Sequence, residues 1–402
     1  MLVILFSLPL CPENAKQSFI KMKTKKLAIL SIICFLTISF NTALFAGEHE
    51  NVSASEAHKT TTVHGEGEEK LNAGKLIMEH IADSHDWHLW GHTSISLPVI
   101  VYNAERGLTV FSSARFNHGH TAYQGYRLME KGKIEAVNEM TETDASLATV
   151  NEALTASSYD ISITKNVLSI FITISILLFV FISVARAYTN KRKGMAPKGL
   201  QNAVEAIVLF MRDDVIKAGI GEKKYEKYVP YLLTLFFFIW INNLLGLIPV
   251  FPGGANVTGN ISVALVLATL TFIITTISGN KNYWQHIFAM PGVPKGVLIL
   301  LTPIEILGVF LRPFVLMIRL FANIAAGHII ALSFFCLIFI FGQESLYGSG
   351  GGLGVSPLSI VFTVFMGFLE LLVAFLQAYV FTLLSSIYIG AAVEDHHHDD
   401  HH

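Results

Sequence analysis

An arginine lies within one of the most apolar stretches of this chain. Arg319 follows Leu-Met-Ile and precedes Leu-Phe-Ala, and no carboxylate lies within a helical turn of it. A guanidinium keeps its proton at any pH that a protein meets, so this side chain stays charged. Placing such a charge at the centre of a membrane-spanning helix costs roughly 2.5–3.5 kcal/mol on insertion scales. The placement therefore indicates a function that needs a fixed positive charge inside a bilayer.

Other polar residues share one side of the same stretch. Glu305, Arg312 and Arg319 recur every seven residues, a spacing that returns to within about 20° of one helical face. Asn323 follows one turn later, and Ala326 continues the face with a small side chain that lets another helix approach. This face predicts contact with a sliding or rotating partner helix. The simpler alternative for Arg312 is that it reaches the membrane interface or pairs with Glu305.

A histidine and a second acid complete the set of candidate site residues. His328 lies nine residues after Arg319, so on an ideal helix it points roughly the opposite way. Glu370 is the only acid between residues 355 and 393, and Gln377 follows it by seven residues on the same face. Isolated ionisable groups inside a membrane typically mark proton pathways. The alternatives are an ion pair of Arg319 with Glu370, a packing role for His328 and interhelical hydrogen bonding by Gln377.

Five apolar runs are long enough to carry these residues across a membrane: Val167–Val184, Val229–Phe251, Ile261–Ser278, Val297–Phe341 and Val355–Val393. The last two exceed the length that a hydrocarbon core of about 30 Å requires, so they must be tilted, kinked or broken, with Pro313 as one kink site. The predicted fold class is an all-α multi-pass membrane protein of about five transmembrane helices, the last two long and tilted. Asn242 and Asn243 in the second run favour interhelical hydrogen bonds.

Residues 198–217 predict a different element, an amphipathic helix on the membrane surface. Its apolar positions recur at helical spacing and comprise Leu200, Val204, Ile207, Val208, Met211 and Val215. The opposite side is predicted to carry Gln201, Glu205, Arg212 and Asp213.

The chain begins with features of a secretory signal peptide. A basic start after Met22, an apolar run and small residues up to Ala46 predict a signal peptide over residues 1–46, with Met22 as the native start. The alternative is a genuine first membrane span. Residues 47–160 then form an exported, periplasmic α+β region, residues 161–395 the membrane domain and residues 396–402 a cytoplasmic tail rich in His and Asp.

Within the exported region, the patterns predict strands over Ser96–Tyr102 and Leu108–Phe111 and a helix over Asn72–Ser84. His85, His88 and His92 have a spacing that would suit a metal on a helix, but surface histidines are the favoured interpretation.

Composition and charge placement bound the function. Of the 402 residues, 52% are hydrophobic and 14% charged, which is typical of a membrane protein with a soluble part. Basic residues follow the first span and precede the second and fourth, whereas residues 252–260 and 342–354 contain none. The positive-inside rule then places the N-terminal region outside and the C-terminus in the cytoplasm. The sequence has no phosphate loop, dinucleotide fingerprint or nucleophile elbow, so we expect no bound nucleotide, no cofactor and no metal.

At this point the residues resemble a known family. Arg319-Leu320-Phe321-Ala322-Asn323, followed by Ala326-Gly327-His328, resembles the signature of subunit a of F-type ATP synthases. The likeness extends over most of residues 162–394 and includes Asn242-Asn243-Leu244-Leu245-Gly246, Asn256-Val257-Thr258 and Leu376-Gln377-Ala378.

The resemblance implies a non-catalytic, proton-translocating stator subunit in the cell inner membrane. Arg319 would face a rotor ring of small c-type proteolipid subunits, with Asn323 and Gln377 near it and Glu305 on the cytoplasmic access path. His328 and Glu370 would belong to the outer half-channel. Peripheral-stalk b-type subunits and lipid would be further partners, and no nucleic acid is expected.

Two features depart from the common family pattern. Gly246 stands where some relatives have an aspartate, and the exported region exceeds the usual length. His328 and Glu370 follow the mitochondrial arrangement, whereas many bacterial members have the acid and the histidine exchanged. The alternative functions are a proton-coupled secondary transporter, which internal symmetry would favour, and a structural membrane anchor, which would leave Arg319 and Glu370 unexplained.

Overall fold

The structure is a computed structural model, and it describes residues 82–90, 93–129, 132–189, 199–248, 251–290, 293–343 and 351–394. The predicted signal peptide, most of the predicted helix over Asn72–Ser84 and the C-terminal tail lie outside these residues. Residues 82–84 of that predicted helix are not helical. The domain boundaries at residues 46, 160 and 395 stay predictions.

Within the residues that the structure describes, five helices are long and apolar enough to cross a membrane, as the sequence predicted. They are α6 (Lys165–Thr189), α9 (Val229–Leu247), α10 (Ile261–Ser278), α12 (Lys295–Gln343) and α13 (Gly351–Val393). These apolar segments are helical because, for a single segment in lipid, a helix satisfies every backbone N–H and C=O group internally. The chain is thus a multi-pass membrane protein.

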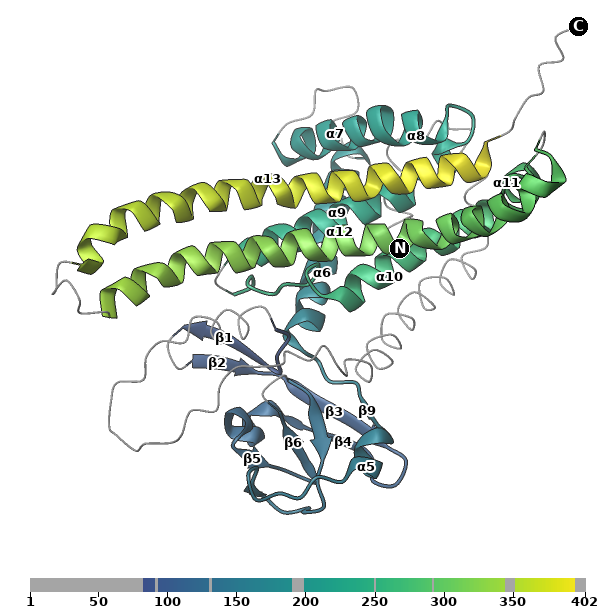
Figure 1. The fold of residues 1–402 in the computed structure, drawn as a ribbon. Coiled ribbons are helices and arrows are strands. Elements are labelled where there is room, and N and C mark those ends of the chain that lie inside the picture. Colours follow the sequence, from purple (N-terminus) through teal and green to yellow (C-terminus); the bar gives the residue numbers. More distant parts are fainter. Residues whose placement is uncertain are drawn as a thin grey trace, which may run out of the picture.

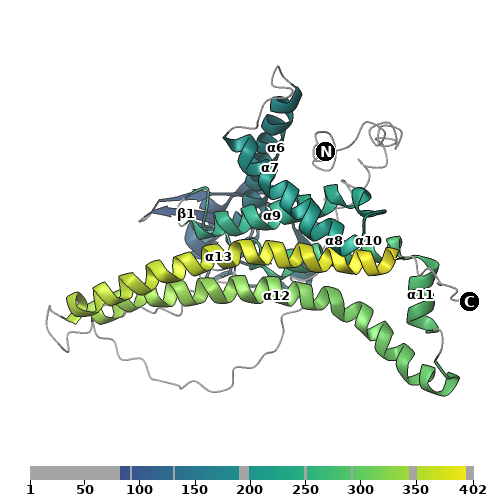
Figure 2. The same ribbon diagram turned by 90° about the horizontal axis from the view of Figure 1, so that it is seen from above.

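The two last helices are much longer than a bilayer is thick. With 49 residues, α12 extends for about 70 Å, and it keeps Pro303 and Pro313 inside one continuous helix. Proline removes a backbone hydrogen bond and bends a helix, and Figure 2 shows α12 curving away from α13 over its N-terminal part, towards α11 (Lys281–Phe288). Elsewhere α12 and α13 lie side by side in both views (Figures 1 and 2).

The core of the membrane domain forms around α9. This helix is apolar on all sides, which is typical of a helix surrounded by others. Its Phe236 and Phe237 are buried, and Phe236 and Trp240 pack edge to face or tilted against Phe375 of α13 and against each other. Helices α6, α10, α12 and α13 contribute to the same cluster. Helix α13 therefore packs against α9, whereas α12 packs against α10 and α13.

The predicted amphipathic helix is present as three consecutive stretches: α7 (Leu200–Phe210), a π-helical turn η2 (Met211–Lys217) and α8 (Ala218–Ile220). Val204, Val208 and Met211 are buried as predicted, but two positions were wrong. Gln201 is buried and Leu200 is 52% exposed, because the packed side of α7 is rotated relative to the predicted face. A short 3₁₀ turn, η3 (Tyr225–Lys227), leads into α9.

The strands form a separate small domain, joined directly to α6 (Figure 1). Its central sheet has the antiparallel order β4-β3-β9, with short two-stranded ribbons β1-β2, β5-β8 and β6-β7 around it. The bounds are β1 Asp86–Trp90, β2 Thr93–Ser96, β3 Pro98–Asn103, β4 Gly107–Ser112, β5 Thr121–Ala122, β6 Tyr126–Leu128, β7 Ile134–Ala136, β8 Thr143–Asp144 and β9 Ser158–Asp160, with η1 Ser113–Gly119 and α5 Glu152–Ala156 as helical turns.

Both strands predicted before the first membrane helix are confirmed, as β3 and β4. Their alternation buries Val99 and Val101 and leaves Leu108 and Val110 exposed, as a sheet with one packed face requires. The alternative of a metal-binding helix over the histidines does not hold, because Asp86–Trp90 is a strand. His85 was expected at the surface, yet it is only 3% exposed and faces Asp160.

Candidate functional site

Arg319 stands on the outer side of α12. Leu316, Leu320 and Ile324 are buried against the core, whereas Arg319 and Asn323 are exposed. Within the part of the chain that the structure describes, Arg319 forms neither an ion pair nor a side-chain hydrogen bond. The alternative drawn from the sequence, an ion pair between Arg319 and Glu370, is therefore wrong for the described residues. The cation remains on the surface of a helix long enough to cross a membrane.

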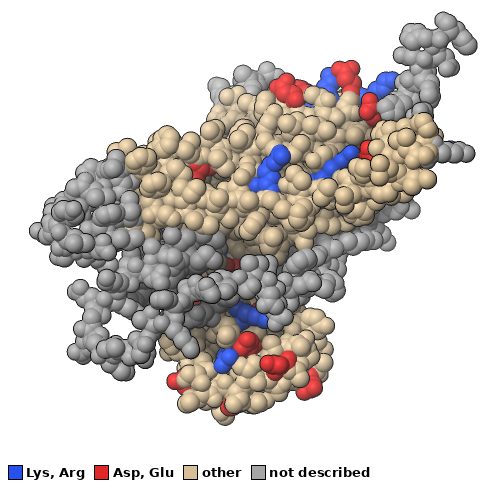
Figure 3. Space-filling model, in the orientation of Figure 1, with Lys and Arg blue, Asp and Glu red and all other residues tan. Residues whose placement is uncertain are grey.

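The surface around this arginine is apolar. Exposed side chains on α12 near it include Phe314, Val315 and Ile318, and the neighbouring helix α13 exposes Leu369, Leu372 and Leu376. Figure 3 shows the face formed by the long helices as mostly uncharged, with a few separate basic and acidic side chains in it. Soluble monomers rarely expose an apolar area of this kind, so this face contacts lipid or another membrane subunit.

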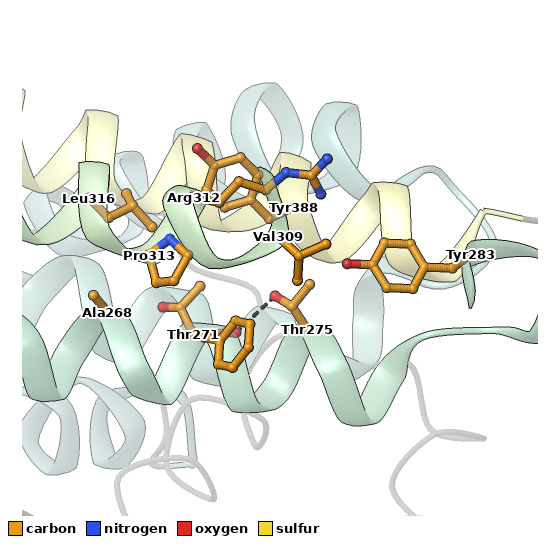
Figure 4. A pocket seen from close by; sticks show the side chains of 10 residues that line it. Ala268, Thr271, Thr275, Tyr283, Val309, Arg312, Pro313, Leu316 and Tyr388 are labelled. Atoms are coloured by element: carbon orange, nitrogen blue, oxygen red, sulfur yellow. Dashed lines mark hydrogen bonds between the residues drawn. The ribbon is translucent and has the colours of Figure 1, made fainter. Parts of the chain in front are cut away.

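Arg312 lies one heptad before Arg319 and has a different environment. Its guanidinium carbon is 5.7 Å from the ring centre of Tyr388 on α13, close enough for a cation–π contact. It lines a narrow cavity together with Thr275 of α10 and Tyr283 of α11 (Figure 4). Among the described residues it forms no ion pair with Glu305, so that alternative was wrong. Glu305 itself is partly exposed on α12.

His328 and Glu370 are brought together between α12 and α13. The distance from Nδ1 of His328 to Oε1 of Glu370 is 3.9 Å, and the two side chains are 15% and 14% exposed. A small rearrangement or one bridging water would join them, as catalytic groups in unliganded structures often require. The structure thus places an imidazole and a carboxylate, two side chains often used in proton transfer, beside each other.

Two glycines allow this pair its close packing. A Cβ on Gly327 would lie 3.2 Å from Oε1 of Glu370, and a Cβ on Gly246 would lie 3.5 Å from Nε2 of His328. The position at which some relatives carry an aspartate is thus directly beside His328. In this chain the His328 ring and the Ala255 carbonyl lie next to that space, which gives a physical reason for the glycine.

Buried amides on α9 bond this helix to its neighbours. Asn243 of α9 donates from Nδ2 to the carbonyl of Ala374 on α13 at 2.9 Å, and its Oδ1 accepts from the Thr258 hydroxyl at 2.5 Å. Asn242 accepts from Thr173 of α6 at 3.0 Å. The predicted interhelical role of both asparagines is confirmed. Gln377, one heptad after Glu370, is only 6% exposed.

The structure thus arranges the six candidate residues in two groups. Arg319 and Asn323 face outward from α12, with Glu305 on the same helix nearer its start. His328 and Glu370 meet between the helices, and Gln377 is buried on α13. Sequence reasoning missed the Arg312–Tyr388 contact and the Thr173–Asn242 bond, because pairing between helices depends on packing that no local spacing encodes.

The chain is similar to known proteins over most of its length. The profile of the family described as ATP synthase A chain matches residues 167–390, and a domain of unknown function matches residues 76–161. The chain is 36% identical to an ATP synthase subunit a of Chlorobium phaeobacteroides, over 88% of this chain and 86% of that protein. It is 38% identical to one of Pelodictyon phaeoclathratiforme, over 87% and 84%, and 48% identical to an ATP synthase subunit a 2 of Chlorobaculum tepidum, over 62% and 67%.

Proposed function

Because the chain belongs to the family of ATP synthase A chains, we propose that it is the proton-translocating stator subunit of an F-type ATP synthase. One observation supports this most strongly: Arg319 is a permanent cation on an exposed apolar face, unpaired within the described chain. Such a charge is stable in a membrane only if an anion or water reaches it from outside the chain. A ring of rotor subunits with membrane carboxylates supplies that anion.

The mechanism follows from the electrostatics of a fixed cation. A rotor carboxylate must be neutral to face lipid, because an ionised one is costly there. Close to Arg319 the opposite charge favours its ionised form, so the proton leaves. The same cation repels protons that would otherwise leak directly between the two sides. Each proton that crosses contributes roughly 2.3 kcal/mol per 100 mV of membrane potential, which biases the direction of rotation.

Two aqueous half-channels deliver and remove the protons in this proposal. His328 and Glu370 form the outer one, because they are the ionisable pair between α12 and α13. Glu305 belongs to the cytoplasmic one, since it lies nearer the start of α12, beside the segment that basic residues orient inward. Asn323 and Gln377 lie on the same two helices and adjust the surroundings of Arg319.

The remaining assignments concern location and partners. We place the chain in the cell inner membrane, with the strand domain in the periplasm and the C-terminus in the cytoplasm. The exposed face of α12 and α13 takes the c-type ring, and peripheral-stalk b-type subunits hold the stator. Nucleotide chemistry belongs to other subunits of the complex, and this chain contributes hydrogen ion transport.

The test is ATP-driven proton pumping by the assembled complex with Arg319→Ala. We expect the subunit to insert and assemble while pumping falls to background. Arg312→Ala is the matched control, because it removes the same side chain from the same helix at a position packed on Tyr388; it should keep most of the pumping. Full pumping by Arg319→Ala would overturn the assignment.

A further inference from the structure

The inner side of α6 carries a row of polar residues that the proposed function does not use. Asn166, Ser169 and Thr173 are spaced by three and four residues, so they lie above one another on one helical face. Their exposed fractions are 4%, 0% and 0%. Burying polar side chains in this way costs free energy unless hydrogen bonds satisfy them.

Several of these buried polar atoms have no hydrogen-bond partner among the described residues. They include Oδ1 of Asn166 and Oγ of Ser169, together with Nδ2 of Asn256 in the loop after α9 and both ring nitrogens of His85. Buried polar groups in native proteins are nearly always satisfied by protein or by ordered water. Neighbouring orphans of this kind therefore indicate a site that binds water.

These atoms belong to one joint between the strand domain, α6 and the loop before α10. Trp87 of β1 is 2% exposed and packs edge to face on Phe251, with ring centres 5.2 Å apart. It shares an apolar cluster with Ala255 and Val257, which flank Asn256, and with Leu168 and Ile170, which flank Ser169. The apolar cluster thus brings the loop and this part of α6 together.

The inner end of the row is bonded to α9, and other residues of α9 contact α13 and His328. Thr173 donates to Oδ1 of Asn242, and the next residue, Asn243, is bonded to the carbonyl of Ala374. Ala374 lies four residues, about one turn, after Glu370 on α13. Gly246, three residues after Asn243, is the glycine that packs beside His328.

The outer end of the row meets ionisable groups of the strand domain. Oδ1 of Asp83 accepts from the backbone N–H of Asn166 at 3.1 Å, and Lys165 lies beside it. His85 Nε2 is 3.7 Å from Oδ2 of Asp160, whose side chain is 39% exposed. Asp86 follows His85 in the chain, and its Oδ2 is 3.8 Å from Nδ1 of His118, whose side chain is 67% exposed. The cluster therefore has contact with outside water at Asp160 and His118.

The charges at this end suit proton exchange. Burial raises the pKa of Asp83, although hydrogen bonds and the nearby Lys165 and His85 oppose that shift. His85 lies beside the Asp160 carboxylate, and histidine is a common proton-exchanging side chain in proteins. The cluster thus pairs a carboxyl and an imidazole in the same way as Glu370 and His328 do deeper in the protein.

We propose that the strand domain and α6 form the outer access path for protons, a hydrated row from Asp160 and His85 through Asn166, Ser169 and Thr173 to the His328–Glu370 pair. This inference rests on the proposed function and assigns the exported domain a role in it. A proton that binds at the outer cluster is matched by one delivered to Glu370, so the row itself is unchanged after each transfer. Trp87 packs the strand domain against the loop after α9 and so fixes the position of His85 and Asp160 relative to α6.

The first experiment tests whether water reaches the row. In a chain whose Cys11, Cys34 and Cys336 are replaced by serine, Ser169→Cys and Asn166→Cys are compared with Ser175→Cys, an exposed position on the opposite side of α6 whose hydroxyl only bonds the Phe171 carbonyl. The assembled complex is reconstituted in vesicles, its ATPase sector is removed, and passive proton conduction is measured before and after adding Ag⁺. Thiolates react with Ag⁺ only where water supports ionisation.

We expect Ag⁺ to lower conduction about tenfold for Ser169→Cys or Asn166→Cys, and to leave Ser175→Cys unaffected. A tenfold loss corresponds to about 1.4 kcal/mol, which is within the cost of leaving a buried polar contact unmade. Ag⁺ insensitivity of both buried variants, with conduction intact, would overturn the proposal. So would equal sensitivity of all three variants.

The second experiment separates this inference from the proposed function. Ser169→Leu fills the row with an apolar side chain, Ser175→Leu makes the same change on the exposed side, and Glu370→Gln blocks the pair itself. We expect Ser169→Leu and Glu370→Gln to slow passive conduction while Ser175→Leu does not. If Glu370→Gln conducts normally, the proposed function fails. If Glu370→Gln is slow and Ser169→Leu conducts like Ser175→Leu, only the access path is refuted.

Discussion

His328 and Glu370 should act as one unit, and a double-mutant cycle measures this. Their nitrogen and oxygen lie 3.9 Å apart, and both side chains are about six-sevenths buried. For full charges at about 4 Å, an effective dielectric constant of about 20 gives roughly 4 kcal/mol as an upper bound. A histidine carries a charge only when it is protonated, so we expect a smaller coupling of about 1–2 kcal/mol, within the range for residues in contact. That equals about 5- to 30-fold in rate.

The assay is passive proton conduction in reconstituted vesicles for His328→Ala, Glu370→Gln and the double variant. Each single change should slow conduction, and the double variant should be about as slow as the slower single one. Ser333→Ala is the control on the same helix, because Ser333 is exposed and its hydroxyl donates to the Ile329 carbonyl of its own helix; it should conduct normally. If the loss in the double variant equals the product of the two single losses, the residues act independently and the reasoning is refuted.

Three further predictions concern packing and pH. Gly390→Ala should lower the free energy of unfolding by roughly 1–3 kcal/mol, because the new Cβ would meet the Gly219 carbonyl, whereas Gly367→Ala, with no atom in reach, should not; thermal unfolding of the complex decides, and equal melting temperatures would contradict it. Although burial raises the pKa of Asp160, hydrogen bonds from its neighbours outweigh this and hold the pKa below its usual value. The ionised Asp160 therefore stabilises the fold above the unfolded pKa of about 3.9, and this stabilisation is lost as pH falls through the lower folded pKa. Amide hydrogen exchange in β3 and β9 should then accelerate on acidification less in Asp160→Asn than in the parent. Identical pH profiles of the two proteins would count against this. Trp87→Ala should cost roughly 3–5 kcal/mol at the joint and speed hydrogen exchange in the loop after α9, and unchanged exchange there would mean that the domain is not docked through this residue.

The membrane helices could be predicted closely because their signal is local. An apolar run long enough to span must be helical in lipid, and the predicted run Ile261–Ser278 coincides with α10. The unusual length of α12 and α13 was also predicted, because their apolar runs exceed the thickness of a bilayer. The rotation of the surface helix was predicted less well. Its packed side is set by contact with other helices, which buried Gln201 and exposed Leu200.

The candidate site divides in the same way. Arg319 and Glu370 stand out in the sequence because a lone charge in an apolar run is conspicuous without any structure. That Glu370 meets His328 and not Arg319 depends on how α12 and α13 pack, and only the family resemblance suggested it. The polar row on α6 escaped notice, because serine and threonine are ordinary in membrane helices. Its spacing of three and four residues was the available signal.

The most direct measurement is a structure of the assembled complex in its membrane sector. The account predicts that the Arg319 guanidinium faces the rotor ring and lies within about 6 Å of a ring carboxylate, the range over which an opposite charge shifts ionisation. A structure in which that guanidinium contacts only lipid, or binds a group of its own chain far from any ring subunit, would contradict it.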